Sequence, residues 1–271
     1  MAKIAKSVYH YWKIRLCVTK QKDYDLITLI KEIIEKHKHR IGYRKVTDEL
    51  RDLGFVVNHK KVLRIMKENN LLCTKFKHRN RTYKSYKGNV GKTAKNKLNR
   101  RFITDRPYQK LLTDVTQFNI NNGNRLYLST IFDVCTKEII SYSISKRPTL
   151  EFVMESLSKA IKVIPNLPYR TTIHSDQGWQ YQHKTWVQTL KKNRIIQSMS
   201  RKGNCLDNSP MENFFGILKQ EMFYGESFGS YDELEKEIND YIEYYNLVRK
   251  KRKLKSKTPV EYRNLALMTV A

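Results

Sequence analysis

The chain has 271 residues, of which 53 are Lys or Arg and 26 are Asp or Glu, so its formal net charge is +27. Such an excess favours a polyanionic partner, nucleic acid first and an anionic membrane surface second, over the small substrates of most metabolic enzymes. The longest stretch without a charged residue is Val115 to Asn124, well short of the roughly 20 apolar residues that a membrane-spanning helix needs.

The N-terminal segment, residues 1–23, is basic and mixed, with weak helical character. It lacks the apolar stretch of a secretion signal. The cysteines are far apart and form no C-x-x-C pair, which argues against both a zinc ribbon and a disulfide framework. We therefore expect a cytoplasmic protein whose cysteines are reduced. The four cysteines are Cys17, Cys73, Cys135 and Cys205.

Residues 24–73 have the pattern of three short helices. Apolar residues at helical spacing predict a first helix over 24–37, and a second, short helix ends at Gly54. Asn58 is a good N-cap for a third helix. This order suits a helix-turn-helix DNA-binding domain whose third helix enters the major groove. A plain three-helix bundle with a solvated basic face is the alternative. The candidate DNA-binding residues of the third helix are Lys60, Lys61 and Arg64.

Residues 74–104 are predicted to be a basic linker. Between 74 and 101 there are eleven Lys or Arg residues and no Asp or Glu, and three aromatic residues lie among them. A charge run of this kind is usually a solvated linker, but basic residues interleaved with aromatics also suit a segment that follows a phosphate backbone. We expect both properties together. The candidate phosphate contacts are Arg79, Arg81, Lys84 and Lys87.

The pattern changes over residues 105–226, the predicted catalytic core. Three strands in succession, with a turn signal at Asn122-Gly123, predict an antiparallel meander. Helices and short strands then alternate, which indicates parallel strands. The result is an α/β fold with a mixed five-stranded sheet, the order of the ribonuclease-H-like fold. The predicted strands are 111–120, 125–132, 138–145, 171–174 and 194–198, and the predicted helices are 149–163, 179–192 and one that starts near Ser209.

The C-terminal residues, 227–271, are predicted to form one more amphipathic helix, over 231–247, and a basic tail. The tail carries a dense run of Lys and Arg between 249 and 257. Cations in such a run need only be within reach of phosphates to add non-specific affinity. We take Arg252 as a representative DNA contact of this tail.

Three carboxylates stand out by their positions. Asp114 lies in the middle of the first strand, Asp176 just beyond the fourth, and Glu212 in the first turn of the late helix. In the predicted sheet these elements are neighbours, so the carboxylates can converge. Carboxylate oxygens bind Mg²⁺ or Mn²⁺, and two such ions can promote an in-line phosphoryl transfer. A metal site also reconciles clustered carboxylates with a protein that holds phosphate.

Each of these residues has a simpler interpretation. Asp114 could be a structural ion pair, and Asp176 could close a simple turn. Glu212 could close a capping box over 209–212, with Pro in the first helical turn. Other carboxylates are weaker candidates as ligands: Asp133, which a turn over 133–137 explains well, and Asp207, the first substitute for a third ligand.

Several motifs resemble one family. They are Leu112-Thr-Asp-Val-Thr116, His174-Ser-Asp-Gln-Gly178 and the long stretch Ser200 to Lys219, with 35 residues between Asp176 and Glu212. The chain resembles the bacterial insertion-sequence transposases with a retroviral-integrase-type DDE core, the IS-three family, over about residues 24–264. One departure is Leu111, where relatives often carry Trp.

The resemblance implies metal-dependent DNA strand cleavage at insertion-sequence ends and transfer of the 3′-hydroxyl to target DNA. It implies that Asp114, Asp176 and Glu212 form the metal-binding triad, with Lys219 and Asn208 close by. A homo-oligomer on DNA is expected. If the chain is the downstream part of a frameshift fusion, an upstream-frame helix-turn-helix protein is a further partner. The competing hypotheses are a non-catalytic DNA-binding regulator and a plain ribonuclease H or structure-selective nuclease.

Overall fold

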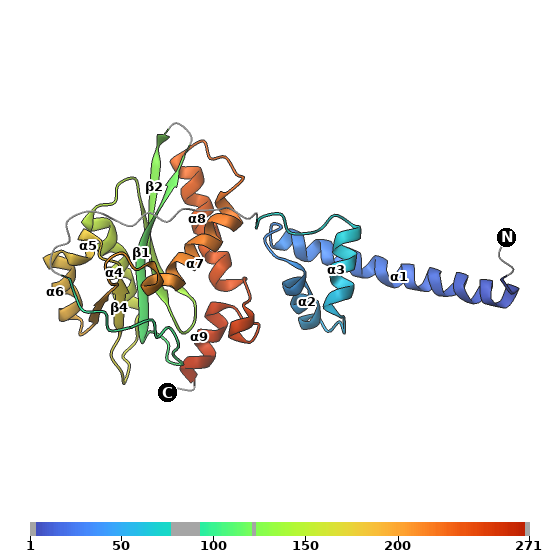
Figure 1. Cartoon of the computed structure of the whole chain (residues 1–271), viewed down its shortest axis with the longest axis horizontal. Coiled ribbons are helices and arrows are strands. Elements are labelled where there is room, and N and C mark those ends of the chain that lie inside the picture. Colours follow the sequence, from blue (N-terminus) through green and yellow to red (C-terminus); the bar gives the residue numbers. More distant parts are fainter. Residues whose placement is uncertain (1–3, 77–92, 121–122, 269–271) are drawn as a thin grey trace. The chain divides into compact units, whose positions relative to one another are not determined.

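The computed structural model describes residues 4–76, 93–120 and 123–268 (Figure 1). The chain divides into two compact units, Met1–His78 and Arg79–Ala271, which we call the first and second unit. Several residues predicted from the sequence lie outside the described ranges: Arg79, Arg81, Lys84, Lys87 and the turn residue Asn122.

The first unit consists of α1 (Lys6–Lys36), α2 (Tyr43–Asp52) and α3 (His59–Glu68). Its core is formed by apolar residues from all three helices, among them Ile30, Leu50 and Ile65. The cap predicted for α3 is confirmed, because the side chain of Asn58 accepts a hydrogen bond from Lys60 N–H. The second unit has an α/β fold, so the predicted fold class, an α/β core preceded by an all-α helix-turn-helix region, is confirmed.

Helix α1 begins much earlier than the sequence pattern indicates. The prediction starts at residue 24, whereas the helix starts at Lys6. Residues 4–15 are all exposed, so no apolar stripe marks this part of the helix. The segment contains neither Pro nor Gly, so nothing in it interrupts a helix. Within the described ranges no helix is both long and apolar enough to cross a bilayer.

The second unit is built on the mixed five-stranded sheet that the sequence predicts. Its strands are β1 (Lys110–Asn119), β2 (Arg125–Asp133), β3 (Ile139–Ser145), β4 (Thr172–Ser175) and β5 (Ile196–Met199), in the order β3-β2-β1-β4-β5. β1 pairs antiparallel with β2 and parallel with β4. β1 is therefore the central strand, and it runs in the same direction as its neighbour β4.

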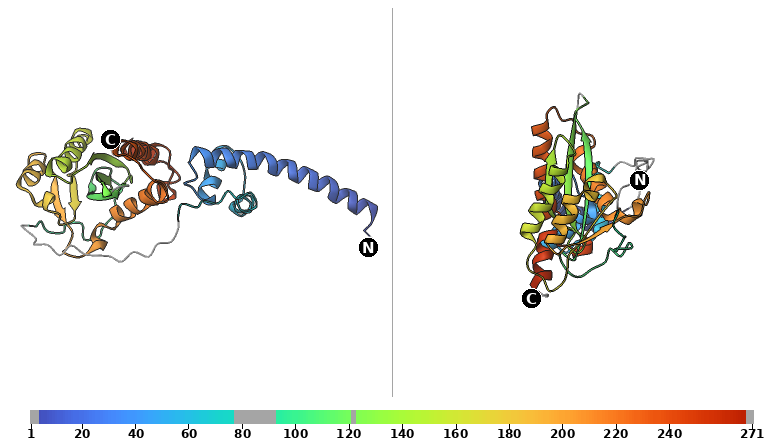
Figure 2. Two further views of the ribbon diagram at one scale, coloured as in Figure 1. Left: turned by 90° about the horizontal axis from the view of Figure 1, so that it is seen from above. Right: turned by 90° about the vertical axis from the view of Figure 1, so that its left-hand side faces the viewer.

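Helices cover both faces of the sheet (Figures 1 and 2). On one face lie α4 (Leu150–Val163) and α6 (Lys184–Lys192), and on the other lie α7 (Ser209–Leu218) and α8 (Tyr231–Leu247). Because side chains alternate along a strand, neighbouring residues of β1 face opposite layers. Leu111 belongs to the α4 and α6 layer, and Leu112 belongs to the α7 and α8 layer.

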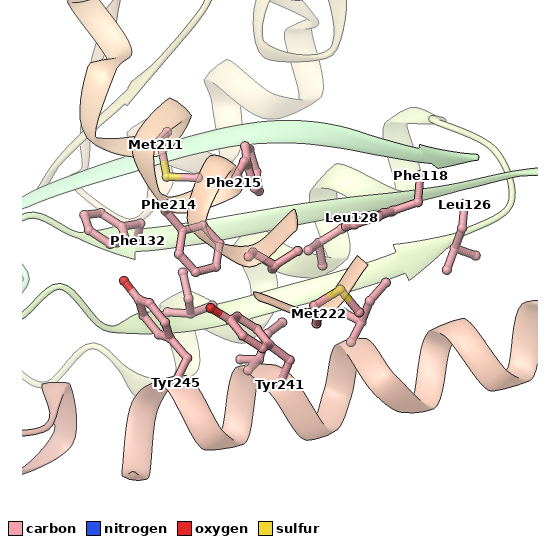
Figure 3. Close-up of a cluster of buried hydrophobic side chains, with 14 of the residues drawn as sticks. Phe118, Leu126, Leu128, Phe132, Met211, Phe214, Phe215, Met222, Tyr241 and Tyr245 are labelled. Atoms are coloured by element: carbon pink, nitrogen blue, oxygen red, sulfur yellow. The ribbon is translucent and has the colours of Figure 1, made fainter. Parts of the chain in front are cut away.

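Figure 3 shows how α7 is packed between the sheet and α8. Phe214 of α7 contacts the ring of Tyr245 of α8 edge to face, with 4.9 Å between ring centroids. On its other side it approaches Phe132 of β2, at 6.1 Å. Burial of large aromatic side chains is among the stronger packing contributions in a core. This packing fixes the first turn of α7, which carries Glu212, beside the central strand.

Two further differences from the prediction concern helices: one predicted helix is divided, and one helix was not predicted. The helix predicted over 179–192 is divided into α5 (Trp179–Gln182) and α6 at His183, whose ring nitrogen accepts a hydrogen bond from Thr185 N–H. A further helix, α9 (Pro259–Met268), follows the basic tail. It opens with a reciprocal capping box, in which Thr258 and Glu261 each accept a hydrogen bond from the other's backbone N–H.

Residues 93–104, which we call the strap, were predicted as part of the linker but pack against the second unit. Leu98 is buried in its core. Lys97 N–H donates to the Ser198 hydroxyl at 2.8 Å, and Ala94 N–H approaches the Met199 sulfur at 3.2 Å. The strap therefore lies along β5. Basic composition indicated solvation, but the backbone of this segment and its one buried leucine hold it on the protein.

Candidate active site

The three predicted carboxylates come from three different elements of the second unit. Asp114 lies in β1, Asp176 follows β4, and Glu212 lies in the first turn of α7. Loss of hydration, followed by the charges of Asp176 and Glu212, raises the pKa of Asp114 well above its ordinary value. The structure thus brings the three carboxylates into one electrostatic neighbourhood. Within the described ranges, however, no three His, Cys, Asp or Glu side chains already surround a common point as metal ligands.

Asp114 has little to stabilise its negative charge. Its own neighbour Val115 donates a backbone hydrogen bond at 2.8 Å, and the Asn208 amide is 3.5 Å away. No lysine or arginine among the described residues forms an ion pair with it. The interpretation of Asp114 as half of a structural ion pair therefore has no support. A partly buried carboxylate without a cation is costly, and a bound cation would relieve that cost.

Asp176 stands on a firmly anchored loop. His174, two residues before it, is fully buried and shares hydrogen bonds with the hydroxyls of Ser198 at 2.8 Å and Ser200 at 3.0 Å. Burial lowers the pKa of His174 to about 4, so its imidazole is neutral near pH 7. The Gln177 amide donates to the Ser200 carbonyl at 3.0 Å. The loop is therefore held on both sides of Asp176.

The carboxylate of Asp176 is oriented by Gly178, whose N–H donates to Oδ1 at 2.9 Å. A Cβ at position 178 would lie 3.0 Å from the same oxygen, so only glycine leaves the carboxylate in its place. Oδ2 accepts no hydrogen bond from the described residues. A simple turn thus explains the hydrogen bond to Oδ1 of Asp176 and gives Oδ2 no role. Reduced hydration raises the pKa of Asp176, and the Gly178 hydrogen bond opposes that rise.

Glu212 does not close a capping box. The N-cap of α7 is Asn208, no side chain caps the helix, and Ser209 already lies within it. The capping interpretation of Glu212 is therefore wrong, because the predicted cap residue, Ser209, is one position after the actual N-cap. The side chain of Glu212 is exposed, and reduced hydration raises its pKa. It is available as a ligand.

Asn208 and Lys219 are the other two residues expected near the carboxylates, and each contacts a residue of β1. Asn208 is buried, and its carbonyl oxygen has no hydrogen-bond partner among the described residues. The Lys219 ammonium donates to the Gln117 carbonyl of β1 at 2.8 Å and lies over the ring of Phe118. Its positive charge lowers the pKa of Asp114. A cation and an unsatisfied oxygen thus flank the carboxylates.

The remaining candidate carboxylates have structural partners. Asp133 accepts hydrogen bonds from Tyr108 N–H, Cys135 N–H and the Thr136 hydroxyl, which confirms that it closes a turn. Asp207 is fully buried and pairs with two arginines, which lower its pKa. Sequence reasoning missed these arginines, because Arg100 comes from the segment predicted as linker.

In the first unit, two of the three candidate DNA-binding residues form ion pairs within the protein. Asp23 of α1 lies 2.8 Å from the Lys61 ammonium and 3.0 Å from the Arg64 guanidinium, and Arg64 also pairs with Glu68. Lys60 is exposed at the start of α3. The side chains of Lys61 and Arg64 remain 40% and 49% exposed, whereas that of Asp23 is 16% exposed, so solvent reaches both cations. In the second unit, Arg252 is exposed in the loop after α8.

Comparison with known proteins identifies the same units. A family model described as Integrase core domain matches residues 104–205, a second of the same description matches 212–267, and one described as HTH-like domain matches 20–80. A similar solved structure is a simian T-cell lymphotropic virus intasome in complex with PP2A regulatory subunit B56 gamma. Its TM-score is 0.50 at 16% identity, over 87% of this chain and 74% of the other, which supports the fold.

Curated relatives share nearly the full length. InsK, the transposase assigned to insertion sequence element IS150 in Escherichia coli K12, is 44% identical over 98% of this chain and 92% of its own. A transposase-like protein of Haemophilus influenzae is 45% identical over 78% of this chain and 95% of its own. InsF, the transposase for insertion sequence IS3A of E. coli K12, is 28% identical over 97% of this chain and 91% of its own. The chain therefore belongs to the IS3 family of insertion-sequence transposases with an integrase-type core, DDE polynucleotidyl transferases that cleave DNA and transfer its strands.

Proposed function

We propose that Asp114, Asp176 and Glu212 are the catalytic carboxylates of this transposase and that together they hold Mg²⁺ or Mn²⁺, as two ions. The observation that carries the proposal is the placement of the three carboxylates on neighbouring elements, in β1, directly after β4 and in the first turn of α7. The raised pKa of Asp114, caused by lost hydration and by the two other carboxylates, supports it. Carboxylate oxygens are the donors that hard divalent cations prefer, and the unpartnered Asn208 oxygen adds to them. Bound ions would activate the attacking oxygen and stabilise the leaving one.

Two other residues of the site position either the DNA or a carboxylate. The substrate is the end of the insertion sequence, where cleavage exposes a 3′-hydroxyl that then attacks target DNA. Lys219, held at the β1 carbonyl of Gln117, is placed to contact a phosphate close to Asp114. The Asn208 amide points its NH₂ group at Asp114 and so keeps that carboxylate oriented.

The two units divide the labour of DNA binding. We propose that residues 24–73 recognise the element ends through Lys60, Lys61 and Arg64. Most non-specific affinity would come from the basic residues of 74–101 and 249–257, which include Arg79, Arg81, Lys84, Lys87 and Arg252. We expect the working form to be a homo-oligomer on DNA, and an upstream-frame helix-turn-helix protein remains a hypothesis.

The carboxylates are tested by cleavage and strand transfer on duplex oligonucleotides that carry the ends of the encoding element. Activity is expected in Mg²⁺ or Mn²⁺ and not in EDTA. Asp114→Asn, Asp176→Asn and Glu212→Gln should each lower the rate by more than about 100-fold, since loss of even an outer partner of a metal ligand costs 10–100-fold. DNA binding should persist. The control is Glu155→Gln, an exposed carboxylate of α4 paired with Lys159, which should remain active.

Cleavage in EDTA would contradict the metal proposal, and an active Glu212→Gln variant would remove Glu212 from the triad. The division of labour has its own test, binding to element ends and to random DNA at two salt concentrations. Each phosphate contact removed from 74–101 should flatten the slope of log K against log salt by about 0.9, alike for all sequences. Substituting Lys60 should instead reduce discrimination between ends and random DNA.

A further inference from the structure

A cluster around Asp207 joins the strap to the loop that precedes α7. Asp207 is fully buried and accepts hydrogen bonds from the side chains of Asn96 at 3.0 Å and Arg100 at 2.9 Å, both in the strap. From its own loop it accepts two from the Arg201 guanidinium, at 2.8 and 2.9 Å, and one from Arg201 N–H. We call these four residues the Asp207 cluster.

The cluster holds more positive charge than its carboxylate neutralises. Two guanidinium groups share one carboxylate, so the cluster keeps a net charge of about +1. The arginine side chains remain 43% and 57% exposed although Asp207 itself is buried. Arg100 also donates to the Asn204 side chain. The Nη1 group of each arginine has no partner among the described residues, so each presents a donor to solvent.

The cluster lies next to the catalytic carboxylates. Asp207 immediately precedes Asn208, whose amide approaches Asp114. Arg201 immediately follows Ser200. The Ser200 hydroxyl hydrogen-bonds to His174, and the Ser200 carbonyl accepts a hydrogen bond from the Gln177 side chain. These two partners lie before and after Asp176 in the sequence. Both ends of the Arg201–Asp207 loop are thus tied to carboxylate-bearing segments.

We propose that Arg100 and Arg201, fixed in orientation by Asp207, form a binding site for a backbone phosphate of the DNA beside the catalytic carboxylates. This inference rests on the proposed function, which places the DNA there. A guanidinium is planar and always charged, and it binds phosphate with paired hydrogen bonds. Because Asp207 already holds both side chains, little conformational entropy is lost when phosphate binds. Asp207 is a positioning residue in this arrangement.

The full-length wild-type protein provides the first test, in EDTA so that no DNA is cleaved. Phenylglyoxal, which modifies arginine, is applied with and without a random-sequence duplex, and modified peptides are quantified by mass spectrometry. The duplex should slow modification of Arg100 and Arg201 several-fold. Arg170 is the control, an exposed arginine before the start of β4, at the opposite end of that strand from Asp176. Unchanged reactivity of Arg100 and Arg201 would overturn the proposal and leave the cluster a structural clasp.

A double variant, Arg100→Gln with Arg201→Gln, tests the same site by affinity, with Arg170→Gln as its control. The slope of log K against log salt should fall by about 0.9 in magnitude for the double variant, the value for one phosphate. An unchanged slope in a folded double variant would also overturn the proposal. Asp114→Asn is measured alongside. If this variant still cleaves DNA, the catalytic assignment of Asp114 is wrong. The phosphate site is judged separately, by the binding and protection results alone.

Discussion

Asp114 and Asp207 are both aspartates of the second unit, both close to the active site, and their surroundings are opposite. Asp207 accepts hydrogen bonds from Asn96 and two arginines, and the arginines, Arg201 above all, lower its pKa. Asp114 receives one short backbone hydrogen bond, and lost hydration and two neighbouring carboxylates raise its pKa. The carboxylate of Asp207 is fully hydrogen-bonded and paired with cations, whereas that of Asp114 is not.

The difference separates a structural carboxylate from a catalytic one. A buried charge that is fully hydrogen-bonded has no capacity left for a ligand, whereas one left unsatisfied is held ready for a cation or substrate. The sequence offers both residues as metal ligands, with Asp207 as the first substitute for a third one. Only the three-dimensional partners, above all Arg100 from the strap, decide between them. Substitution of each aspartate tests this distinction, and Gly178→Ala tests the orientation of a third carboxylate, that of Asp176.

The largest expected effect is that of Asp114→Asn. Cleavage should fall by more than about 100-fold, because a metal ligand is lost. At the same time the metal-free protein should become more stable, by on the order of 1 kcal/mol, since a neutral amide relieves the repulsion from Asp176 and Glu212. Thermal unfolding in EDTA measures this gain. A variant that is both inactive and less stable would show that Asp114 has a stabilising role we have not identified.

Asp207→Asn should make the protein less stable, the opposite of the effect of Asp114→Asn. It removes the charge that holds two guanidinium groups, and we expect a loss of about 1.5–3 kcal/mol, the range for hydrogen bonds to charged groups. Because both arginines are partly exposed, the cost should stay below that of breaking a fully buried pair. Urea unfolding measures it. If Asp207→Asn were as stable as the wild type but completely inactive, Asp207 would belong with the catalytic carboxylates.

A smaller effect is expected at Gly178, which orients the Asp176 carboxylate. In Gly178→Ala the new Cβ would lie 3.0 Å from Oδ1, so the carboxylate must move by a few tenths of an ångström. Activity should drop about tenfold, within the range for residues that orient a metal ligand, with little change in stability. Gly216→Ala in α7 is the matched control, because its Cβ meets nothing within 4 Å. Equal activity of the two variants would exclude a role for Gly178.

Local patterns in the sequence were enough for most of the second unit. The apolar residues of each strand and the turn signals between strands place β1, β2 and β3 within about a residue of their true ends, because most positions of these strands are at least partly buried and clear turns separate them. The predicted helix over 149–163 begins at Thr149, which is the N-cap of α4, and its hydroxyl accepts a hydrogen bond from Phe152 N–H. The positions of the three carboxylates came from the same order of elements and from the resemblance to a family.

The parts that escaped prediction depend on distant contacts or on the lack of burial. The start of α1 is exposed and so leaves no periodic pattern. The strap has the composition of a linker, yet Leu98 and the Lys97 N–H bind it to the core. The Asp207 cluster joins residues more than a hundred positions apart, which no local pattern reports.

The smallest and most specific effect is a difference in the pH dependence of stability without metal. The pKa of Asp114 is raised above its ordinary value of 3.8, so between these two values the folded protein holds a proton that the unfolded chain releases. Stability therefore falls as the pH rises through that window. The pKa of Asp207 is lowered, so its contribution is present above 3.8 and is lost as the pH falls further.

Urea unfolding in EDTA over a pH series, compared between variants, separates the two groups. Asp133 and Glu138 also have raised pKa values, so only differences from the wild type are informative. Asp114→Asn should remove part of the decline above pH 3.8 and leave the acid limb unchanged, whereas Asp207→Asn should flatten the acid limb alone. Each proton changes the slope by at most about 1.4 kcal/mol per pH unit. If Asp114→Asn altered only the acid limb, its carboxylate would be a paired, structural charge like that of Asp207, and the distinction between the two would fail.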